Sequence, residues 1–128
     1  IKINFNLKNQ KSLFFMFDNE QISRVFFNLI KNSIESIQEK SSKSTDFDKI
    51  IDIEIFERKD YIGINLSDAG IGFLKNDAKQ LIKPYFTTKE KGSGLGLSIV
   101  NKIISDHDGS IQFMNSKIGA KIEIKLPR

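Results

Sequence analysis

The sequence predicts an α+β fold, in which a mixed or mostly antiparallel sheet carries its helices on one face. Segments that alternate apolar and polar residues, as half-buried strands do, occur in neighbouring pairs along the 128 residues. Two longer segments instead repeat apolar residues every three or four positions, which is typical of core-facing helices. The order strand–strand–helix–strand–strand–(helix)–loop–helix–strand–strand predicts a single two-layer domain over residues 1–128.

The N-terminal part predicts two strands and the longest helix. Residues 1–7 indicate a half-buried strand with four inward side chains, Ile1, Ile3, Phe5 and Leu7. A polar turn leads to a second strand at residues 13–17. Asp18 is expected to cap a helix, because its carboxylate can accept the unpaired N–H groups of the first turn. The apolar stripe of this helix consists of Ile22, Val25, Phe26, Leu29, Ile30 and Ile37.

The middle of the chain predicts a surface loop and then a hairpin. Residues 41–49 are polar and interrupt the helical pattern. Residues 51–56 and 62–66 alternate again, and the tight turn at residues 58–60 joins them as a hairpin. A glycine-containing turn follows at residues 68–72.

The C-terminal part predicts one short helix, one longer helix and a last hairpin. The short helix is expected over about residues 74–82, ending before Pro84. A second helix begins near Gly94 and stops at Gly109, since glycine commonly ends helices. Residues 110–115 and 120–126 form the final hairpin.

Composition excludes several classes of protein. The absence of cysteine excludes a disulfide scaffold, a thiol nucleophile and a thiolate zinc site, and the single histidine, His107, excludes a histidine-rich metal site. No apolar run approaches the roughly 20 residues of a membrane span, and no secretory signal is visible, so we expect a cytoplasmic setting. The net charge of +4 comes from scattered lysines, which favours an anionic nucleotide or a solvated surface over nucleic acid. A chain that opens at Ile1 is expected to be part of a longer protein.

The first candidate site lies on the long helix. Asn28, Asn32, Glu35 and Glu39 fall on one helical face, roughly opposite the core stripe. An amide oxygen is a hard, neutral ligand that suits Mg²⁺, which keeps several waters and takes few protein ligands beside phosphate oxygens. The alternative is a solvated polar face.

The second candidate is Asp68-Ala69-Gly70-Ile71-Gly72, directly after a strand. Its glycines allow a flat ligand to approach the backbone closely. A half-buried carboxylate there can accept hydrogen bonds from an exocyclic amine such as that of adenine. The alternative is a β-turn in which the aspartate caps its own backbone.

The third candidate is the glycine-rich segment of residues 92–97, which opens a helix. Exposed N–H groups and the helix N-terminus together favour phosphate binding, and the alternative is a flexible hinge. Between the second and third candidates lies the segment of residues 83–89. There Phe86 is either a core or a lid residue, and Lys89 is either a solvated charge or a phosphate contact.

Taken in order, these segments resemble the ATP-binding catalytic domain of bacterial sensor histidine kinases. The residues of the last two segments, 84–89 and 92–97, are most similar to those of the nitrogen-regulation type. Residues 28–33 resemble the N box of the family and residues 68–72 its first glycine box. Residues 84–89 resemble the F box, and residues 92–97 the second glycine box. The ending His107-Asp108-Gly109-Ser110 and the closing Leu126-Pro127 also fit.

The resemblance implies a two-layer sandwich of the Bergerat type, with ATP and Mg²⁺ between the helices and a lid over about residues 73–91. Asp68 would bind the adenine amine, Asn32 would ligate Mg²⁺, and Lys89 is a candidate γ-phosphate contact. No residue is assigned as catalytic with certainty. The nucleotide-binding residues implied are Asn28, Asn32, Asp68, Gly70, Gly72, Phe86, Thr88, Lys89, Gly92, Ser93, Gly94, Leu95 and Gly96.

Three positions depart from related patterns. Glu35 stands where many relatives carry a basic residue, so a phosphate contact from it is doubtful. Asn28 stands where gyrase-type ATPases place a glutamate that activates water, which favours phosphoryl transfer to a protein over hydrolysis. Asp108 displaces the second glycine of the terminal turn, with little expected effect.

The implied function is to bind Mg-ATP and donate its γ-phosphate to a histidine on a separate dimerisation hairpin, and through it to a response regulator. His107 is expected to be structural, and the chain by itself to be monomeric, without membrane contact, within a parent protein that could be anchored in the inner membrane. One alternative is a serine-directed kinase of the anti-sigma-factor type. Another is a degenerate module that senses ATP without transferring phosphate.

Overall fold

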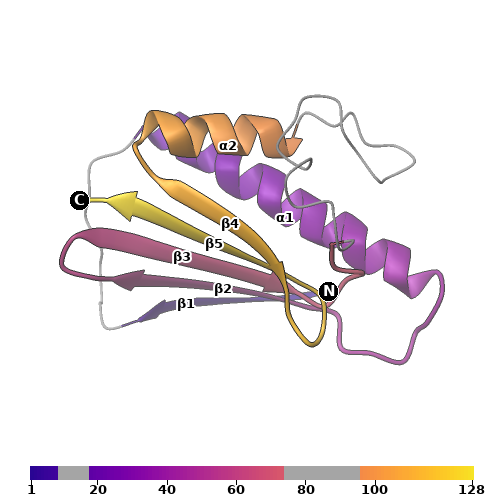
Figure 1. Cartoon of the computed structure of the whole chain (residues 1–128). Coiled ribbons are helices and arrows are strands. Elements are labelled where there is room, and N and C mark those ends of the chain that lie inside the picture. Colours follow the sequence, from indigo (N-terminus) through magenta and orange to yellow (C-terminus); the bar gives the residue numbers. More distant parts are fainter. Residues whose placement is uncertain (9–17, 74–95) are drawn as a thin grey trace.

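The structure, a computed structural model that describes residues 1–8, 18–73 and 96–128, confirms a two-layer α+β architecture (Figure 1). Five described strands form one sheet, and both described helices lie on the same face of it. The elements are β1 (Lys2–Lys8), α1 (Asn19–Ser41), β2 (Ile50–Glu57), β3 (Tyr61–Asp68), α2 (Gly96–Asp106), β4 (Ser110–Asn115) and β5 (Ala120–Pro127). The predicted strand at residues 13–17 and the predicted short helix at residues 74–82 lie outside the described residues.

The sheet has the strand order β1-β2-β3-β5-β4 and is mixed, as predicted. The two predicted hairpins, β2–β3 and β4–β5, are confirmed as antiparallel pairs. The central pair joins β3 to β5, with Ile64 opposite Ile124. At one edge β1 runs parallel to β2, with Ile3 opposite Ile51.

The core lies between the helices and the sheet. The predicted α1 stripe is buried at Ile22, Val25, Leu29 and Ile37, while Phe26 and Ile30 are only partly buried at its margin. Burial of such apolar area is the main favourable term in folding. The stripe meets β-strand residues and the buried face of α2, including Ile51, Leu66, Val100, Ile104 and Ile124.

The prediction of a half-buried first strand is wrong for most of its apolar side chains. Ile1, Ile3 and Phe5 are 53%, 49% and 63% exposed. Their register with β2 turns them to the helix-bearing side, because Ile3 and Phe5 lie opposite the buried Ile51 and Ile53. However, β1 is an edge strand and α1 lies over β3, so these side chains remain uncovered by either helix.

The helix ends are fixed by local hydrogen bonds. The predicted cap of α1 is confirmed, because the backbone N–H of Gln21 donates to Asp18 Oδ1 at 3.1 Å. After the end of α2, which the sequence predicted to stop at Gly109, the left-handed residue is Asp108, with φ of 58°. Gly109 is required for another reason. A Cβ atom on it would lie 2.6 Å from the carbonyl oxygen of Lys125.

His107 joins the end of α2 to the start of α1. Its Nδ1 lies 2.8 Å from the carbonyl oxygen of Ile103, and its Nε2 accepts the backbone N–H of Asp18 at 3.3 Å. This pattern is that of a neutral imidazole with its proton on Nδ1. Both ring nitrogens therefore hold the fold together, in agreement with the structural role expected from the sequence.

Candidate functional site

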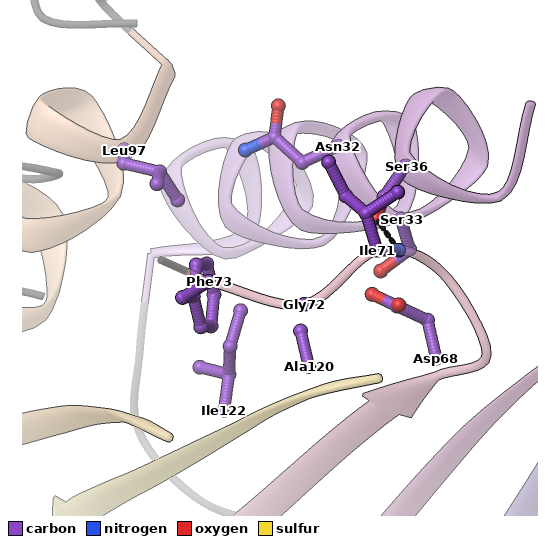
Figure 2. Close-up of a pocket in the computed structure, with 10 residues that line it drawn as sticks. All are labelled: Asn32, Ser33, Ser36, Asp68, Ile71, Gly72, Phe73, Leu97, Ala120 and Ile122. Carbon is purple, nitrogen blue, oxygen red and sulfur yellow. Dashed lines mark hydrogen bonds between the residues drawn. The ribbon is translucent and has the colours of Figure 1, made fainter. Parts of the chain in front are cut away.

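A pocket opens between α1, the segment that follows β3, and the beginnings of α2 and β5 (Figure 2). It holds about 530 Å³ of space, part of it open to solvent. Three predicted residues, Asn32, Asp68 and Gly72, line it together, although Asn32 is distant in the sequence from the other two. The full lining is Asn32, Ser33, Ser36, Asp68, Ile71, Gly72, Phe73, Leu97, Ala120 and Ile122.

Asp68 is the buried acid of this pocket. It is the last residue of β3, it is 3% exposed, and its Oδ1 accepts the N–H of Gly70 at 2.8 Å. Figure 2 shows its carboxylate on the side that faces α1. Asp68 therefore caps the backbone of its own turn, which was the alternative interpretation of this segment. The same residue also lines the pocket. A carboxylate has about four lone-pair positions, and the Gly70 N–H occupies one of them.

The two glycines after Asp68 allow the chain to pass close to its neighbours. A Cβ atom on Gly70 would collide with the Ser36 side chain of α1, and Gly72 has a φ of +76°. Ser36 also accepts the N–H of Ile71 through its Oγ at 2.9 Å (Figure 2). At Gly70, the close neighbour is therefore a helix of the protein itself. Helical spacing from Asn32 is the sequence signal that could have indicated Ser36.

The far end of this segment is held by Asn115, which the sequence pattern does not indicate as a site residue. The N–H of Phe73 donates to Asn115 Oδ1 at 2.7 Å, and Asn115 Nδ2 donates to the carbonyl oxygen of Phe73 at 2.8 Å. The Phe73 ring packs edge-on against Phe113, with ring centroids 5.7 Å apart. Asn115 lies 42 residues from its partner, so no local pattern could have revealed the pair.

Asn28, Asn32 and Gly96 meet where α2 approaches α1. A Cβ atom on Gly96 would lie 3.3 Å from Asn28 Oδ1 and 4.0 Å from Asn32 Nδ2. Asn28 Nδ2 donates to the carbonyl oxygen of Arg24 at 2.9 Å. The prediction that this polar face lies opposite the core stripe is wrong. These asparagines are half-buried and flank the stripe on the side of α2.

The remaining predicted contacts lie outside the described residues. They are Phe86, Thr88, Lys89, Gly92, Ser93, Gly94 and Leu95, together with residues 74–91 of the expected lid.

The donor chemistry of the pocket fits Mg²⁺ better than a transition metal. Within the described ranges, no three His, Asp or Glu side chains cluster as a ready-made metal cage. Mg²⁺ is usually held by one or two protein oxygens, several waters and the phosphates of its substrate. The Asn32 amide oxygen, on the same pocket as a buried acid, fits that pattern.

Comparison with known proteins identifies the family. The family model described as "Histidine kinase-, DNA gyrase B-, and HSP90-like ATPase" matches residues 17–128, and the chain belongs to this family. Within it, the chain is similar to histidine kinases. It superposes on the catalytic domain of histidine kinase ThkA with a TM-score of 0.80 and 29% identity, covering 98% of this chain and 80% of that one.

Two curated relatives are also sensor or sporulation kinases. Sporulation kinase C of Bacillus subtilis (strain 168) is 31% identical over 128 residues, which cover 99% of this chain and 28% of that protein. Sensor protein TdiS of Thauera aromatica is 37% identical over 110 residues, which cover 84% of this chain and 19% of that protein. The chain therefore spans only 19% to 28% of the length of these relatives. The family and the Bergerat-type fold predicted from the sequence are confirmed.

The described helices do not include a membrane span. Neither α1 nor α2 is long and apolar enough to cross a bilayer.

Proposed function

We propose that this chain binds Mg-ATP in the pocket between α1 and residues 68–73 and donates the γ-phosphate to a histidine on a separate dimerisation hairpin. The observation that carries the proposal is the buried carboxylate of Asp68, which lines the same pocket as Asn32. A buried carboxylate selects a ligand that offers hydrogen-bond donors, and the adenine amine is such a donor. The proposed pose puts adenine at Asp68 and the phosphates toward Asn32 and Gly96.

The rest of the pocket supports that pose. Gly72, Phe73 and Ile122 give the base an apolar surface, and the beginning of α2 brings the positive end of a helix near Asn32. Asn32 is the proposed ligand of Mg²⁺. A bound Mg²⁺ would neutralise charge on the phosphates, which together with positioning is the main requirement of phosphoryl transfer. Contacts from Phe86, Thr88, Lys89 and residues 92–95 are proposed on the sequence resemblance alone.

The position of Asn28 supports transfer to a protein over hydrolysis. Its amide is bonded to the carbonyl oxygen of Arg24 and cannot act as a general base toward water. His107, the single histidine of the sequence, has both ring nitrogens engaged in hydrogen bonds. The acceptor histidine is therefore proposed to belong to another part of the parent protein, which passes the phosphate to a response regulator. We expect the present chain to be a cytoplasmic monomer that does not phosphorylate itself.

Calorimetric titration with the non-hydrolysable analogue AMPPNP, with and without Mg²⁺, tests the binding step. Asp68→Asn should weaken binding by about 10- to 150-fold, because an amide NH₂ would face the adenine amine and a charge-assisted bond would be lost. Asp52→Asn is the matched control, since Asp52 is exposed on β2, where it accepts from Asn4. Equal affinity of Asp68→Asn and the parent would show that the base does not bind at Asp68.

The metal and transfer steps need separate measurements. Asn32→Asp should alter the Mg²⁺ dependence of AMPPNP binding more than the binding measured without metal. Mixing the chain with a histidine-bearing dimerisation hairpin and γ-labelled ATP should label the hairpin and leave the chain unlabelled. A chain that binds ATP but never labels any hairpin would favour the ATP-sensing alternative.

A further inference from the structure

The wall of the pocket formed by Gly72 and Phe73 is held in place from outside the pocket. Gly72 and Phe73 both line the pocket, whereas Asn115 does not. Asn115 is the last residue of β4, opposite Ala120 in the β4–β5 pair. Its amide bonds both the N–H and the carbonyl oxygen of Phe73, at 2.7 and 2.8 Å. The Asn115 side chain therefore makes with Phe73 the two backbone hydrogen bonds that a paired strand would otherwise make.

The same contact constrains Gly72. This residue has a left-handed backbone, and a Cβ atom on it would lie 2.8 Å from Asn115 Oδ1. The Asn115 amide is thus packed directly on the glycine that gives the wall its shape. The other end of the segment is held separately, because Ser36 bonds Ile71 and Gly119 packs against Gly70. Removing Asn115 would release only the Gly72–Phe73 end.

We propose that Asn115 is a positioning residue for the nucleotide. It sets the place of Gly72 and Phe73 relative to Asp68, and so controls the affinity and base preference of the pocket without touching the ligand. This inference rests on the proposed function. Its physical reason is that a preformed wall costs no ordering free energy when a ligand binds, whereas a loosened wall must first be ordered.

The alternative is that Asn115 only stabilises the fold, and the two roles predict different measurements. A purely structural bond lowers the melting temperature, but it leaves the dissociation constant unchanged as long as nearly all molecules are folded at the assay temperature. If part of the protein does unfold at the assay temperature, a purely structural bond lowers the apparent affinity for every ligand by the same factor. A positioning role changes the dissociation constant and the ratio between ligands, because Gly72 and Phe73 contact the base and not the phosphates in the proposed pose.

The test compares AMPPNP, GMPPNP and tripolyphosphate binding to the parent, Asn115→Ala and Asn115→Asp, each with Mg²⁺. Asn115→Ala should weaken AMPPNP binding by about 3- to 10-fold and reduce the preference for AMPPNP over GMPPNP, with little change for tripolyphosphate. Asn115→Asp retains an acceptor for the Phe73 N–H but loses the donor to its carbonyl oxygen, so its effect should be intermediate. It also serves as the second variant if Asn115→Ala fails to fold.

Arg128→Ala provides the matched control for stability. Arg128 bonds Glu57 and Arg58 near the end of β5, the opposite end of that strand from Ala120. The Arg128→Ala variant should have a lower melting temperature than the parent and the same affinity for each of the three ligands. The amide of Phe73 should exchange with solvent faster in Asn115→Ala than in the parent.

The outcomes separate the two proposals. If the parent does not bind AMPPNP, the proposed function fails and this inference fails with it. If the parent binds AMPPNP, and both Asn115 variants bind it equally well while Phe73 exchanges faster, the inference alone is overturned. A uniform loss for all three ligands would likewise overturn it.

Discussion

At the scale of single residues, Asp108 has a left-handed backbone conformation, which aspartate tolerates but glycine adopts more readily. Within the described part of the chain it is the non-glycine residue with a positive φ, 58°. It lies two residues after Asp106, the last residue of α2, at the position where glycine is usual. The carboxylate also lies near the negative end of the helix dipole. The left-handed backbone and the negative charge near the helix end both lower the stability of the folded state.

Asp108→Gly should therefore stabilise the fold by about 0.5–1 kcal/mol. The glycine would adopt the left-handed conformation without steric cost and would remove a like charge from the helix end. Urea denaturation of both proteins measures the difference in unfolding free energy. Asp108→Ala is the control and should destabilise the fold, because it keeps a Cβ atom and loses the tolerance of aspartate for this conformation. A loss of stability in Asp108→Gly would contradict the expectation.

Residues whose role depends on near neighbours in the sequence could be predicted. Residues that bond a distant part of the chain could not. Asp68 was predicted as a pocket residue because it follows an alternating strand and precedes two glycines. Ser36 and Asn115 were not predicted, because their partners Ile71 and Phe73 lie 35 and 42 residues away. Helical spacing places Ser36 on the same face as Asn32, but nothing in the local sequence identifies the distant backbone partner of Ser36 or of Asn115.

At the scale of secondary-structure elements, the start of α1 depends on one cap. Asp18 accepts the N–H of Gln21, and Asp18→Ala should lower the unfolding free energy by about 1 kcal/mol because that donor would lose its partner. Thermal unfolding followed by circular dichroism measures the change. Asp18→Asn is the control and should change stability much less, since asparagine caps helices about as well as aspartate. Equal losses in the two variants would show that the charge matters more than the hydrogen bond.

The elements themselves were largely predictable from periodicity, but their partners were not. The α1 stripe and both hairpins follow from local patterns and short turns. The same alternation suggested a half-buried β1, yet Phe5 is 63% exposed because the helices do not reach that edge strand. Periodicity shows which residues share a face, and it does not show what covers that face.

At the scale of the whole molecule, the two layers depend on the contact between α1 and the sheet. Leu29 is completely buried in the core, while Phe27, two residues earlier on α1, is 67% exposed. Leu29→Ala should lower the unfolding free energy by about 2–5 kcal/mol, because it removes buried apolar surface and leaves a cavity. This is a large share of the roughly 5–15 kcal/mol that stabilises an ordinary domain.

Phe27→Ala is the matched control on the same helix and should change the unfolding free energy by no more than about 0.5 kcal/mol. Urea denaturation of both variants checks the contrast. A cost for Phe27→Ala as large as that for Leu29→Ala would mean that the exposed side of α1 is covered in solution.

The order of strands was the least predictable feature at this scale. The pairing of β3 with β5 joins strands that are not consecutive among those described, and the parallel pairing of β1 with β2 joins strands that are separated by α1. Each strand alternates in the same way whichever neighbour it pairs with, so alternation alone cannot rank the possible neighbours. The resemblance to histidine kinases implied the Bergerat-type fold that the comparisons confirm.

The pairing of β3 with β5 also has a consequence for the kinetics of folding. The two hairpins are closed by short turns and form with little entropic cost, whereas the β3–β5 pair closes a much longer stretch of chain. The pocket needs Asp68 at the end of β3 and Ala120 at the start of β5, so it is complete only after that late step. A ligand bound there should slow unfolding far more than it speeds refolding. Resistance to proteolysis, and not the rate of recovery after denaturation, would then report how much of the protein carries nucleotide.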